Sequence, residues 1–311
     1  MMKKPVRLRD FIEDREGRLY AVSAYDNTEK IGCLLRYIPD PAGDRTRKGE
    51  RRYRKLDFDE AYAYISREKP EYADLIQRIP FTDVASVLKP EEEMGAIVRR
   101  SPLVARLAAV LGLPEGSHGC TGSYLCGLET GESDVDLVVY GRTFFSAQKI
   151  LRRGIARGNI SPVSDEIWET IYRKRRPELP RDEFLLHERR KDNRGEISGV
   201  YFDLLFTRSY DALDPSPVRK GPVCGKMTIE ATVTDASLSF DSPARYLVDH
   251  EEIQRVLCFS HTYTGQARDG ELIQASGICE EHCGERWLIV GTTREARGEF
   301  IRSLSLLEKN T

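Results

Sequence analysis

One short segment, residues 119–141, constrains the fold and chemistry of this chain more than any other. It reads GCTGSYLCGLETGESDVDLVVYG, with Gly122-Ser123, a spacer of 10 residues and then Asp134-x-Asp136 leading an apolar run. The acids alternate with apolar residues, and residues i and i+2 of a strand project from the same face. We therefore expect Asp134 and Asp136 to project together from the start of a strand.

Two carboxylates on one face repel each other unless a cation lies between them. Mg²⁺ prefers oxygen ligands, commonly one or two carboxylates together with substrate phosphates. A pair of such ions can hold the attacking and leaving oxygens of a nucleotidyl transfer. A third carboxylate is available in Asp203, which lies in the apolar run GVYFDLLF at 199–206. We predict that this run is a strand beside residues 135–140 and brings Asp203 to the other two acids.

Each part of this pattern also has a simpler interpretation. An Asp-x-Asp pair is often a solvated strand end or a helix cap, and a Gly-Ser pair is often only a turn. Asp203 could be an acid at a strand end that pairs with an arginine such as Arg208. The order, the spacing and the third acid together favour the metal site.

Together these residues resemble the nucleotidyltransferase superfamily of DNA polymerase beta. That superfamily has an apolar residue, Gly-Gly or Gly-Ser, a spacer, and then Asp-apolar-Asp or Glu-apolar; only Thr121 departs from the pattern here. The likeness is greatest to the predicted nucleotidyltransferases of archaea and covers about residues 95–210. It implies an archaeal source and an α+β fold with a core of mixed sheet and helices.

The resemblance also implies a role for each matching residue. Gly122 would let the backbone approach a triphosphate, and Ser123 with the amides after it would bind phosphate oxygens. Asp134 and Asp136 would hold Mg²⁺, or Mn²⁺ in its place. Asp203 would hold the catalytic metal and help to take a proton from the attacking hydroxyl. The substrate would be an NTP, and pyrophosphate would be released.

Two basic stretches are further candidates for binding phosphate. Arg189, Arg190 and Lys191 come shortly before the strand of Asp203 and could neutralise the triphosphate of the nucleotide. The polar stretch 39–52 is expected to be a loop without periodicity, whose charges are better explained as a solvated surface.

The domain organisation follows from local composition. We expect a β-rich accessory domain at 1–90, the catalytic domain at 91–213 and an OB-like β-barrel domain at 214–311. The Pro-rich stretch 211–222 marks the second boundary, and short alternating runs beyond it predict a small barrel. The runs are Lys226–Val233, Arg255–His261, Glu271–Ile278 and Trp287–Thr292.

Helices are predicted around the motif. Pro90 and the acids after it open a helix, Pro102 should break or kink it, and Gly112 ends it. Further helices are expected at 71–77, 144–157, 165–175 and 297–307.

The expected barrel carries two further candidate sites. Phe259, Tyr263 and Arg268 could bind a single strand, although a generic barrel core and rim explains them equally well. Cys279, His282 and Cys283 suggest zinc, but a tetrahedral site needs four ligands. A hairpin turn with free thiols is the favoured interpretation.

Charge and hydropathy exclude some classes of protein. The 48 Lys and Arg residues nearly balance 50 Asp and Glu residues, so any nucleic-acid surface must be a local patch. We expect no membrane segment, because no apolar run reaches the required length. Residues 1–5 lead into no apolar stretch, so no secretory signal is expected. The 7 scattered cysteines suit a reducing cytoplasm.

The sequence thus favours a Mg²⁺-dependent nucleotidyltransferase that acts on a hydroxyl of a polynucleotide, most plausibly RNA or tRNA. One alternative keeps the catalysis but changes the acceptor to a protein or a small molecule. The other is a non-catalytic module that binds a nucleotide or nucleic acid.

Overall fold

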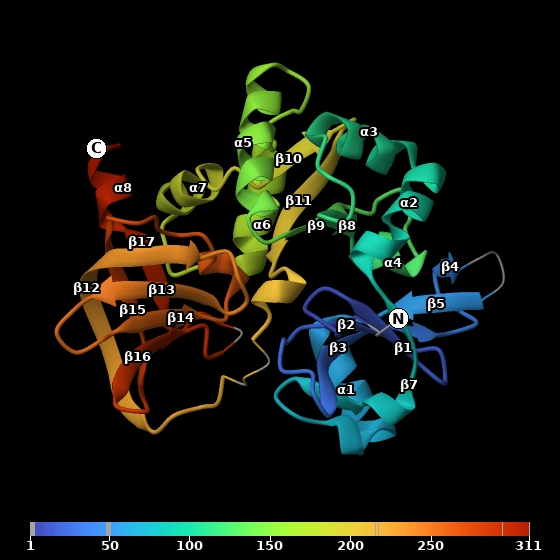
Figure 1. The fold of residues 1–311 in the computed structure, drawn as a ribbon, viewed down its shortest axis with the longest axis horizontal. Coiled ribbons are helices and arrows are strands. Elements are labelled where there is room, and N and C mark those ends of the chain that lie inside the picture. Colours follow the sequence, from blue (N-terminus) through green and yellow to red (C-terminus); the bar gives the residue numbers. More distant parts are fainter. Residues whose placement is uncertain (1–3, 48–50, 215, 217, 294, 311) are drawn as a thin grey trace. The chain divides into compact units, whose positions relative to one another are not determined.

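The chain forms two compact units. The computed structural model describes residues 4–47, 51–214, 216, 218–293 and 295–310 (Figure 1). Unit 1 comprises Met1–Pro162 and Asn193–Pro217, and unit 2 comprises Val163–Asp192 and Val218–Thr311. This division differs from the three expected domains in two ways. The N-terminal part packs with the predicted core, and residues 163–192 pack with the barrel.

The first sheet of unit 1 is built from the N-terminal part of the chain. Its strand order is β4-β5-β3-β2-β1-β7, and β6 pairs with β3. The strands are β1 Phe11–Asp14, β2 Leu19–Val22, β3 Lys30–Pro39, β4 Arg45–Arg47, β5 Arg51–Lys55, β6 Gln77–Pro80 and β7 Val84–Leu88.

Helix α1, Phe58–Glu68, begins after the N-terminal cap Asp57. The Asp57 side chain accepts a hydrogen bond from the backbone N–H of Glu60, and the Glu60 carboxylate accepts one from the backbone N–H of Asp57. This reciprocal pair satisfies two donors that a helix start would otherwise leave open. The helix packs Ile65 into the apolar core beneath the sheet.

Two predictions for this region are wrong. The stretch 39–52 is not a plain loop, because it contributes β4 and the start of β5. The expected helix at 71–77 is a single 3₁₀ turn, Pro70–Tyr72, followed by β6.

The second sheet of unit 1 carries the predicted acids, and its strand order is β10-β11-β9-β8. Its strands are β8 His118–Cys120, β9 Val135–Tyr140, β10 Arg194–Ile197 and β11 Val200–Thr207. The β9 and β11 strands run parallel, whereas the β8–β9 and β10–β11 pairs are antiparallel. The predicted pairing of the Asp203 strand beside 135–140 is therefore confirmed.

Four helices accompany this sheet: α2 Pro90–Arg100, α3 Pro102–Leu111, α4 Gly122–Cys126 and α5 Thr143–Ala156. The predicted break lies at Pro102, where α3 begins after the Ser101 cap, and Gly112 ends α3 in the left-handed conformation. Helix α5 packs against β9 and β11, the two strands that carry the acids.

Unit 2 combines α6, α7 and the C-terminal barrel. Its helices are α6 Asp165–Arg175, α7 Arg181–Arg189 and α8 Leu304–Glu308, and its strands are β12 Val223–Leu238, β13 Ala244–Asp249, β14 Arg255–Cys258, β15 Leu272–His282, β16 Glu285–Val290 and β17 Phe300–Ser303. Within the described residues, β12-β13-β14-β16-β15 close into a five-stranded barrel, because β15 pairs back to β12. The expected fold, α+β with a C-terminal β-barrel, is thus confirmed at this level.

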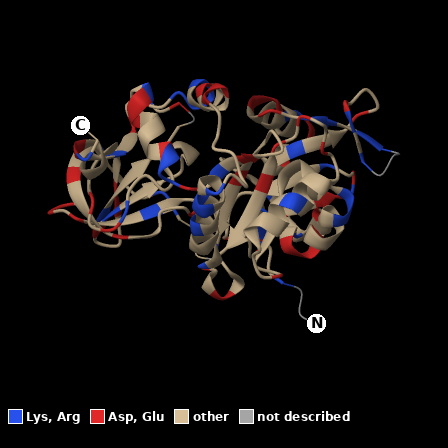
Figure 2. Cartoon of the chain, turned by 90° about the horizontal axis from the view of Figure 1, so that it is seen from above, with Lys and Arg blue, Asp and Glu red and all other residues tan. Residues whose placement is uncertain are grey.

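Two properties of the described residues bear on the expectations about charge and membrane segments. Acidic and basic residues are both spread over the chain (Figure 2). Among the described residues, no helix has the length and apolar character needed to cross a membrane.

Candidate functional site

Strand register brings Asp136 and Asp203 together. In the parallel β9–β11 pair the two residues are direct partners. Asp134 lies immediately before β9 and is exposed, whereas Asp136 is half-buried. Three acids from segments about 70 residues apart in sequence therefore gather at one end of the sheet.

The surroundings of Asp136 disfavour the charged form of its carboxyl. Burial, reinforced by the charges of Asp134 and Asp203, raises its pKa to about 7. Arg9 and Lys55 act in the opposite direction but do not offset the rise. A carboxyl with this pKa is only partly ionised at neutral pH, and a bound cation would favour its charged form.

The Gly122-Ser123 turn lies directly against Asp136. The Thr121 backbone N–H donates to the Asp136 carbonyl oxygen at 2.9 Å. Gly122 has φ +65°, and a Cβ added there would lie 3.0 Å from Asp136 Oδ2. The glycine is required both by its backbone conformation and by this close approach. Ser123 follows in the first turn of α4.

Asp203 has protein partners of its own. Arg194 Nε donates to the two carboxylate oxygens at 3.3 and 3.2 Å, Asn193 Nδ2 donates at 3.1 Å and the Tyr201 hydroxyl donates at 3.1 Å. Arg194 is the register partner of Asp203 across β10–β11. The simpler interpretation of Asp203 as an ion-paired acid thus has support, with Arg194 as the partner in place of Arg208.

The repulsion between the acids favours a bound cation, but the described residues do not offer a complete set of ligands. A divalent cation would relieve the repulsion between Asp134 and Asp136, which adds to the larger effect of burial in raising the pKa of Asp136. However, no group of three His, Cys, Asp or Glu side chains within the described residues is arranged to hold a metal ion. Asp203 would have to share its oxygens between Arg194 and a metal, so its role as a ligand stays a prediction.

An apolar cluster attaches the N-terminal sheet to this site. Tyr37 and Tyr53 pack with Leu125, Cys126 and Leu128, which are in or just after α4. This contact fixes the sheet against the helix that begins with the Gly-Ser turn. The side chains of the same sheet face are therefore held beside the acids.

That sheet face also carries cations, of which only Arg45 lies in a stretch that the sequence offered as a phosphate-binding candidate. Lys55 is the register partner of Tyr37, and Arg45 Nη1 donates to the Leu128 carbonyl at 2.8 Å. Burial, then the charges of Arg36 and Arg45, lower the pKa of Lys55, whereas Asp134 and Asp136 raise it. We call the cations near the acid pair the basic rim; they are Arg9, Arg36, Arg45 and Lys55.

The three basic residues predicted to bind the nucleotide lie in unit 2 and have partners there. Arg189 pairs with Asp165 at 2.9 Å at the surface. Arg190 forms two bonds with Glu271, at 2.7 and 2.9 Å. The buried Lys191 ammonium pairs with Glu188 and donates to the Thr262 carbonyl at 3.2 Å. These contacts indicate that Arg190 and Lys191 attach α7 to the barrel, and their binding to a nucleotide stays a prediction.

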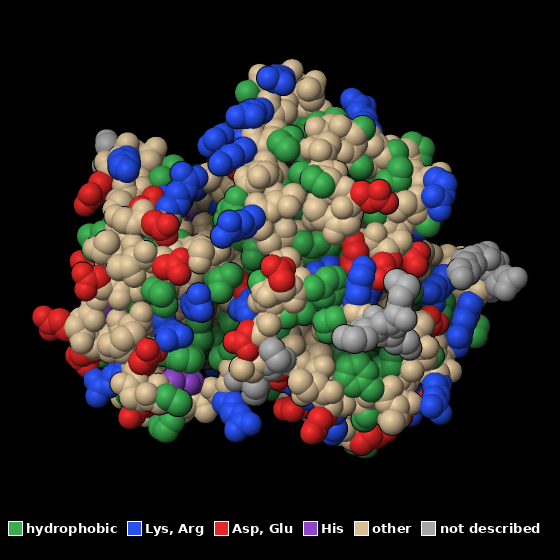
Figure 3. Space-filling model, viewed as in Figure 1, with side chains coloured by type: hydrophobic (Ala, Val, Ile, Leu, Met, Phe, Trp, Pro, Cys, Tyr) green, Lys and Arg blue, Asp and Glu red, His purple; other side chains and the backbone are tan. Residues whose placement is uncertain are grey.

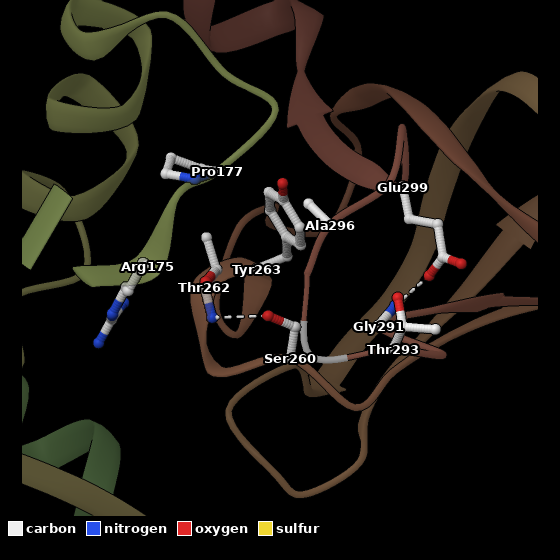
Figure 4. A pocket seen from close by; sticks show the side chains of 9 residues that line it. All are labelled: Arg175, Pro177, Ser260, Thr262, Tyr263, Gly291, Thr293, Ala296 and Glu299. Carbon is white, nitrogen blue, oxygen red and sulfur yellow. Dashed lines mark hydrogen bonds between the residues drawn. The ribbon is translucent and has the colours of Figure 1, made fainter. Parts of the chain in front are cut away.

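Unit 2 has a shallow pocket of its own (Figure 4). Its volume is about 250 Å³ with open solvent included, below the range of about 300–1,000 Å³ usual for ligand sites. Its polar groups are already bonded within the protein. Thr262 N–H donates to Ser260 Oγ at 3.2 Å, and Gly291 N–H donates to Glu299 Oε2 at 2.6 Å.

The aromatic and basic candidates on the barrel have different surroundings. Tyr263 is buried, and its hydroxyl accepts from the Glu178 N–H at 3.1 Å. Arg268 donates to the Arg190 carbonyl at 3.0 Å, whereas Phe259 is exposed. Phe259 is therefore the exposed aromatic residue of this set.

The possible zinc ligands do not converge among the described residues. Cys279 is buried and Cys283 is exposed. The His282 ring stacks on Trp287 with centroids 3.8 Å apart and lies 3.1 Å from a Glu280 oxygen. These contacts favour the interpretation as a hairpin turn with free thiols.

Comparison with known proteins yields a relative over the full length. The chain is 33% identical over 335 aligned residues to "Uncharacterized protein MJ1086" of Methanocaldococcus jannaschii, with 96% of this chain and 98% of that protein covered. The chain belongs to the same family. No protein-family model matches the chain, and no solved structure matches it. Membership in this family carries no statement about activity, so the function rests on the site.

Proposed function

We propose that the chain is a Mg²⁺-dependent nucleotidyltransferase that transfers NMP from an NTP to a hydroxyl acceptor. The observation that carries the proposal is the register pairing of Asp136 with Asp203, with Asp134 two residues from Asp136. The position of Gly122 against the Asp136 carboxylate supports it. Acids on two parallel strands beside a Gly-Ser turn suit a reaction that needs positioning and charge neutralisation more than covalent chemistry.

The residues divide the work as follows. Asp134 and Asp136 would hold Mg²⁺, which when bound neutralises phosphate charge and orients the phosphoryl group. Gly122 leaves room for a phosphate beside the turn. Asp203 would accept or hold the proton of the attacking hydroxyl, and its bonds to Arg194 and Tyr201 fix the carboxylate for that role.

The basic rim would bind the triphosphate. Arg36, Arg45 and Lys55 belong to unit 1, as the acids do, and the electrostatic coupling of Lys55 with Asp134 and Asp136 supports their proximity. Cations beside the acids would stabilise the phosphate oxygens of a bound nucleotide through charge-assisted hydrogen bonds. The rim therefore replaces Arg189, Arg190 and Lys191 in the proposal.

The barrel favours a polynucleotide acceptor, RNA or tRNA. Numbered along the chain, its strands neighbour one another in the order first, second, third, fifth and fourth, and the fourth closes on the first. This arrangement resembles an OB barrel, a fold that binds single strands through aromatic side chains and a basic groove.

One observation favours a second function. The Arg194–Asp203 ion pair already satisfies the third acid, as a binding module with no turnover would allow. Such a module would bind NTP with Mg²⁺ and release no pyrophosphate.

A transfer assay separates these functions. Purified protein with Mg²⁺ is given each of the four α-labelled NTPs with RNA, DNA or no added acceptor, alongside Asp134→Ala. We expect label to move onto RNA with the wild type, and the rate to fall at least ~100-fold with Asp134→Ala. Label on the protein itself would support the protein-modifying alternative. Metal-dependent NTP binding without transfer to any acceptor would support the binding module.

A further inference from the structure

The outer face of α5 has no role in the site described above. The helix turns Phe144, Ala147, Leu151 and Gly154 into the core of unit 1. It begins three residues after β9 ends and packs on both acid-bearing strands. Phe144 of α5 packs against Phe206, whereas Asp203 projects from the opposite face of β11. The helix therefore covers the face of the sheet that the acids do not occupy.

Four cations line this outer face. Arg142, Lys149, Arg153 and Arg157 are all exposed, at positions i, i+7, i+11 and i+15. At 3.6 residues per turn they fall within an arc of about 80°, whose centre is about 140° around the helix from that of the buried side chains. We call these four residues the α5 stripe, and Figure 3 shows Lys and Arg side chains gathered along this helix.

The stripe is not balanced by acids. The sequence from 137 to 164 contains no Asp or Glu. Within the described part of the chain, the four side chains take part in no hydrogen bond or ion pair. A typical solvated helix face mixes both signs of charge, so this stripe differs from the balanced remainder of the molecule.

Helix stability does not explain the stripe. Cations near a helix C-terminus are favourable, which accounts for Arg153 and Arg157. Arg142 lies at the N-terminal cap, where a cation is unfavourable. Lys149, Arg153 and Arg157 also follow one another at i+4 spacing, where like charges destabilise a helix.

We propose that the α5 stripe binds the phosphate backbone of single-stranded RNA. The stripe is about 22 Å long at 1.5 Å per residue, enough to meet several successive phosphates. Anionic membranes are disfavoured because a helix on a membrane buries an apolar face in it, and the apolar face of α5 lies in the core. None of the exposed large hydrophobic side chains in the described residues is on α5.

The stripe would hold the body of the acceptor RNA on the face of the sheet opposite the acids, a role that rests on the proposed function. Binding itself does not, since it requires neither metal nor turnover. The two claims can therefore fail separately.

The test measures RNA binding by the full-length chain. Anisotropy of a labelled 20-nucleotide RNA is followed over a range of salt with the wild type and with Arg142→Ala, Lys149→Ala, Arg153→Ala and Arg157→Ala combined. We expect the variant to bind at least tenfold more weakly. The slope of log K against log salt should fall by about 3, from four contacts of about 0.7 each.

A matched control removes four exposed cations elsewhere in unit 1: Lys30→Ala, Arg67→Ala, Arg99→Ala and Arg106→Ala. It has the same net charge as the stripe variant and should bind RNA like the wild type. Circular dichroism and thermal midpoints establish that both variants fold. Equal losses in the two variants, or unchanged RNA affinity in the stripe variant, would overturn the proposal.

Two further arms separate the remaining outcomes. Asp136→Asn should bind RNA like the wild type, because it touches the acids and not the stripe. Vesicles rich in phosphatidylserine should not bind through the stripe. Stripe-dependent binding to vesicles with no binding to RNA would overturn the RNA proposal in favour of a membrane surface.

Discussion

Asp136 is the residue on which the electrostatics of the site depend. The residue is half-buried beside two other acids, and the loss of solvent at its carboxyl together with their charges raises its pKa to about 7. Protons and a divalent cation would compete for it near neutral pH, so the affinity for Mg²⁺ should increase as pH rises through this value. This dependence gives the site a measurable signature besides turnover.

The first prediction concerns stability. The pKa of Asp136 in the folded chain lies above the unfolded value of 3.8. The stability that depends on the protonated Asp136 carboxyl is therefore fully present below pH about 4 and is lost as pH rises through about 7. Asp136→Asn carries no charge to lose, so its advantage in unfolding free energy over the wild type should grow by roughly 1–3 kcal/mol between pH 5 and pH 8 without metal.

Thermal melts at the two pH values in EDTA measure this difference. Adding Mg²⁺ at pH 8 should stabilise the wild type and narrow the gap. If the difference in unfolding free energy between Asp136→Asn and the wild type were equal at pH 5 and pH 8, the pKa of Asp136 would not be raised in the folded chain.

The second prediction concerns Gly122. Gly122→Ala forces a side chain into the left-handed conformation, at a cost of about 1–2 kcal/mol, and places its Cβ 3.0 Å from Asp136 Oδ2. Gly116→Ala is the control, because Gly116 has φ +75° and an added Cβ would meet nothing within 4 Å. Both variants should be destabilised similarly, but only Gly122→Ala should lose transfer activity. Equal activities would remove Gly122 from the site.

Sequence identified the acids but not the partner of Asp203. Alternating polar and apolar residues were enough to place Asp136 and Asp203 on strands. The pairing of these two strands was then predicted because it brings the acids together. Arg194 was missed because β10 has only 4 residues, RGEI, without strand-like alternation. The register of a neighbouring strand is decided by packing, which one local sequence does not contain.

Whole elements were predicted well where local signals agree. Helix α6 matches the expected 165–175, because acids open it and Arg173, Lys174 and Arg175 close it. Strands β4 and β5 were missed because five of their eight residues are arginines, so polar and apolar residues do not alternate. Strand β5 depends on its pairing with β3, and β4 depends on its pairing with β5, rather than on a pattern of their own.

The basic rim gives the prediction at this scale. Lys55→Gln should weaken Mg²⁺-NTP binding about tenfold, or ~1.4 kcal/mol, because a charge-assisted bond to phosphate is lost. Arg189→Gln is the matched control, since Arg189 pairs with Asp165 at the surface of unit 2. Equilibrium dialysis with labelled NTP compares them. A larger loss with Arg189→Gln would restore the original nucleotide-binding candidates.

At the scale of the whole molecule, distant contacts decide how the chain is divided. Residues 163–192 separate β9 from β10 in sequence but pack with the barrel. The Arg190–Glu271 ion pair and the bond from Ser303 N–H to His187 Nε2, at 2.9 Å, hold α7 there. The Pro-rich linker marked one crossing between the units, but no local signal marked the crossings near 162 and 192.

The central claim, that the three acids form a nucleotidyltransferase site, is tested most directly by pyrophosphate release. The rate is measured with Mg²⁺, NTP and RNA for the wild type and Asp136→Asn between pH 5.5 and pH 8.5. We expect a wild-type rate that rises through pH about 7, as the Asp136 carboxyl ionises, and a variant rate at least ~100-fold lower throughout. Release by Asp136→Asn at the wild-type rate would mean that the acids do not form such a site.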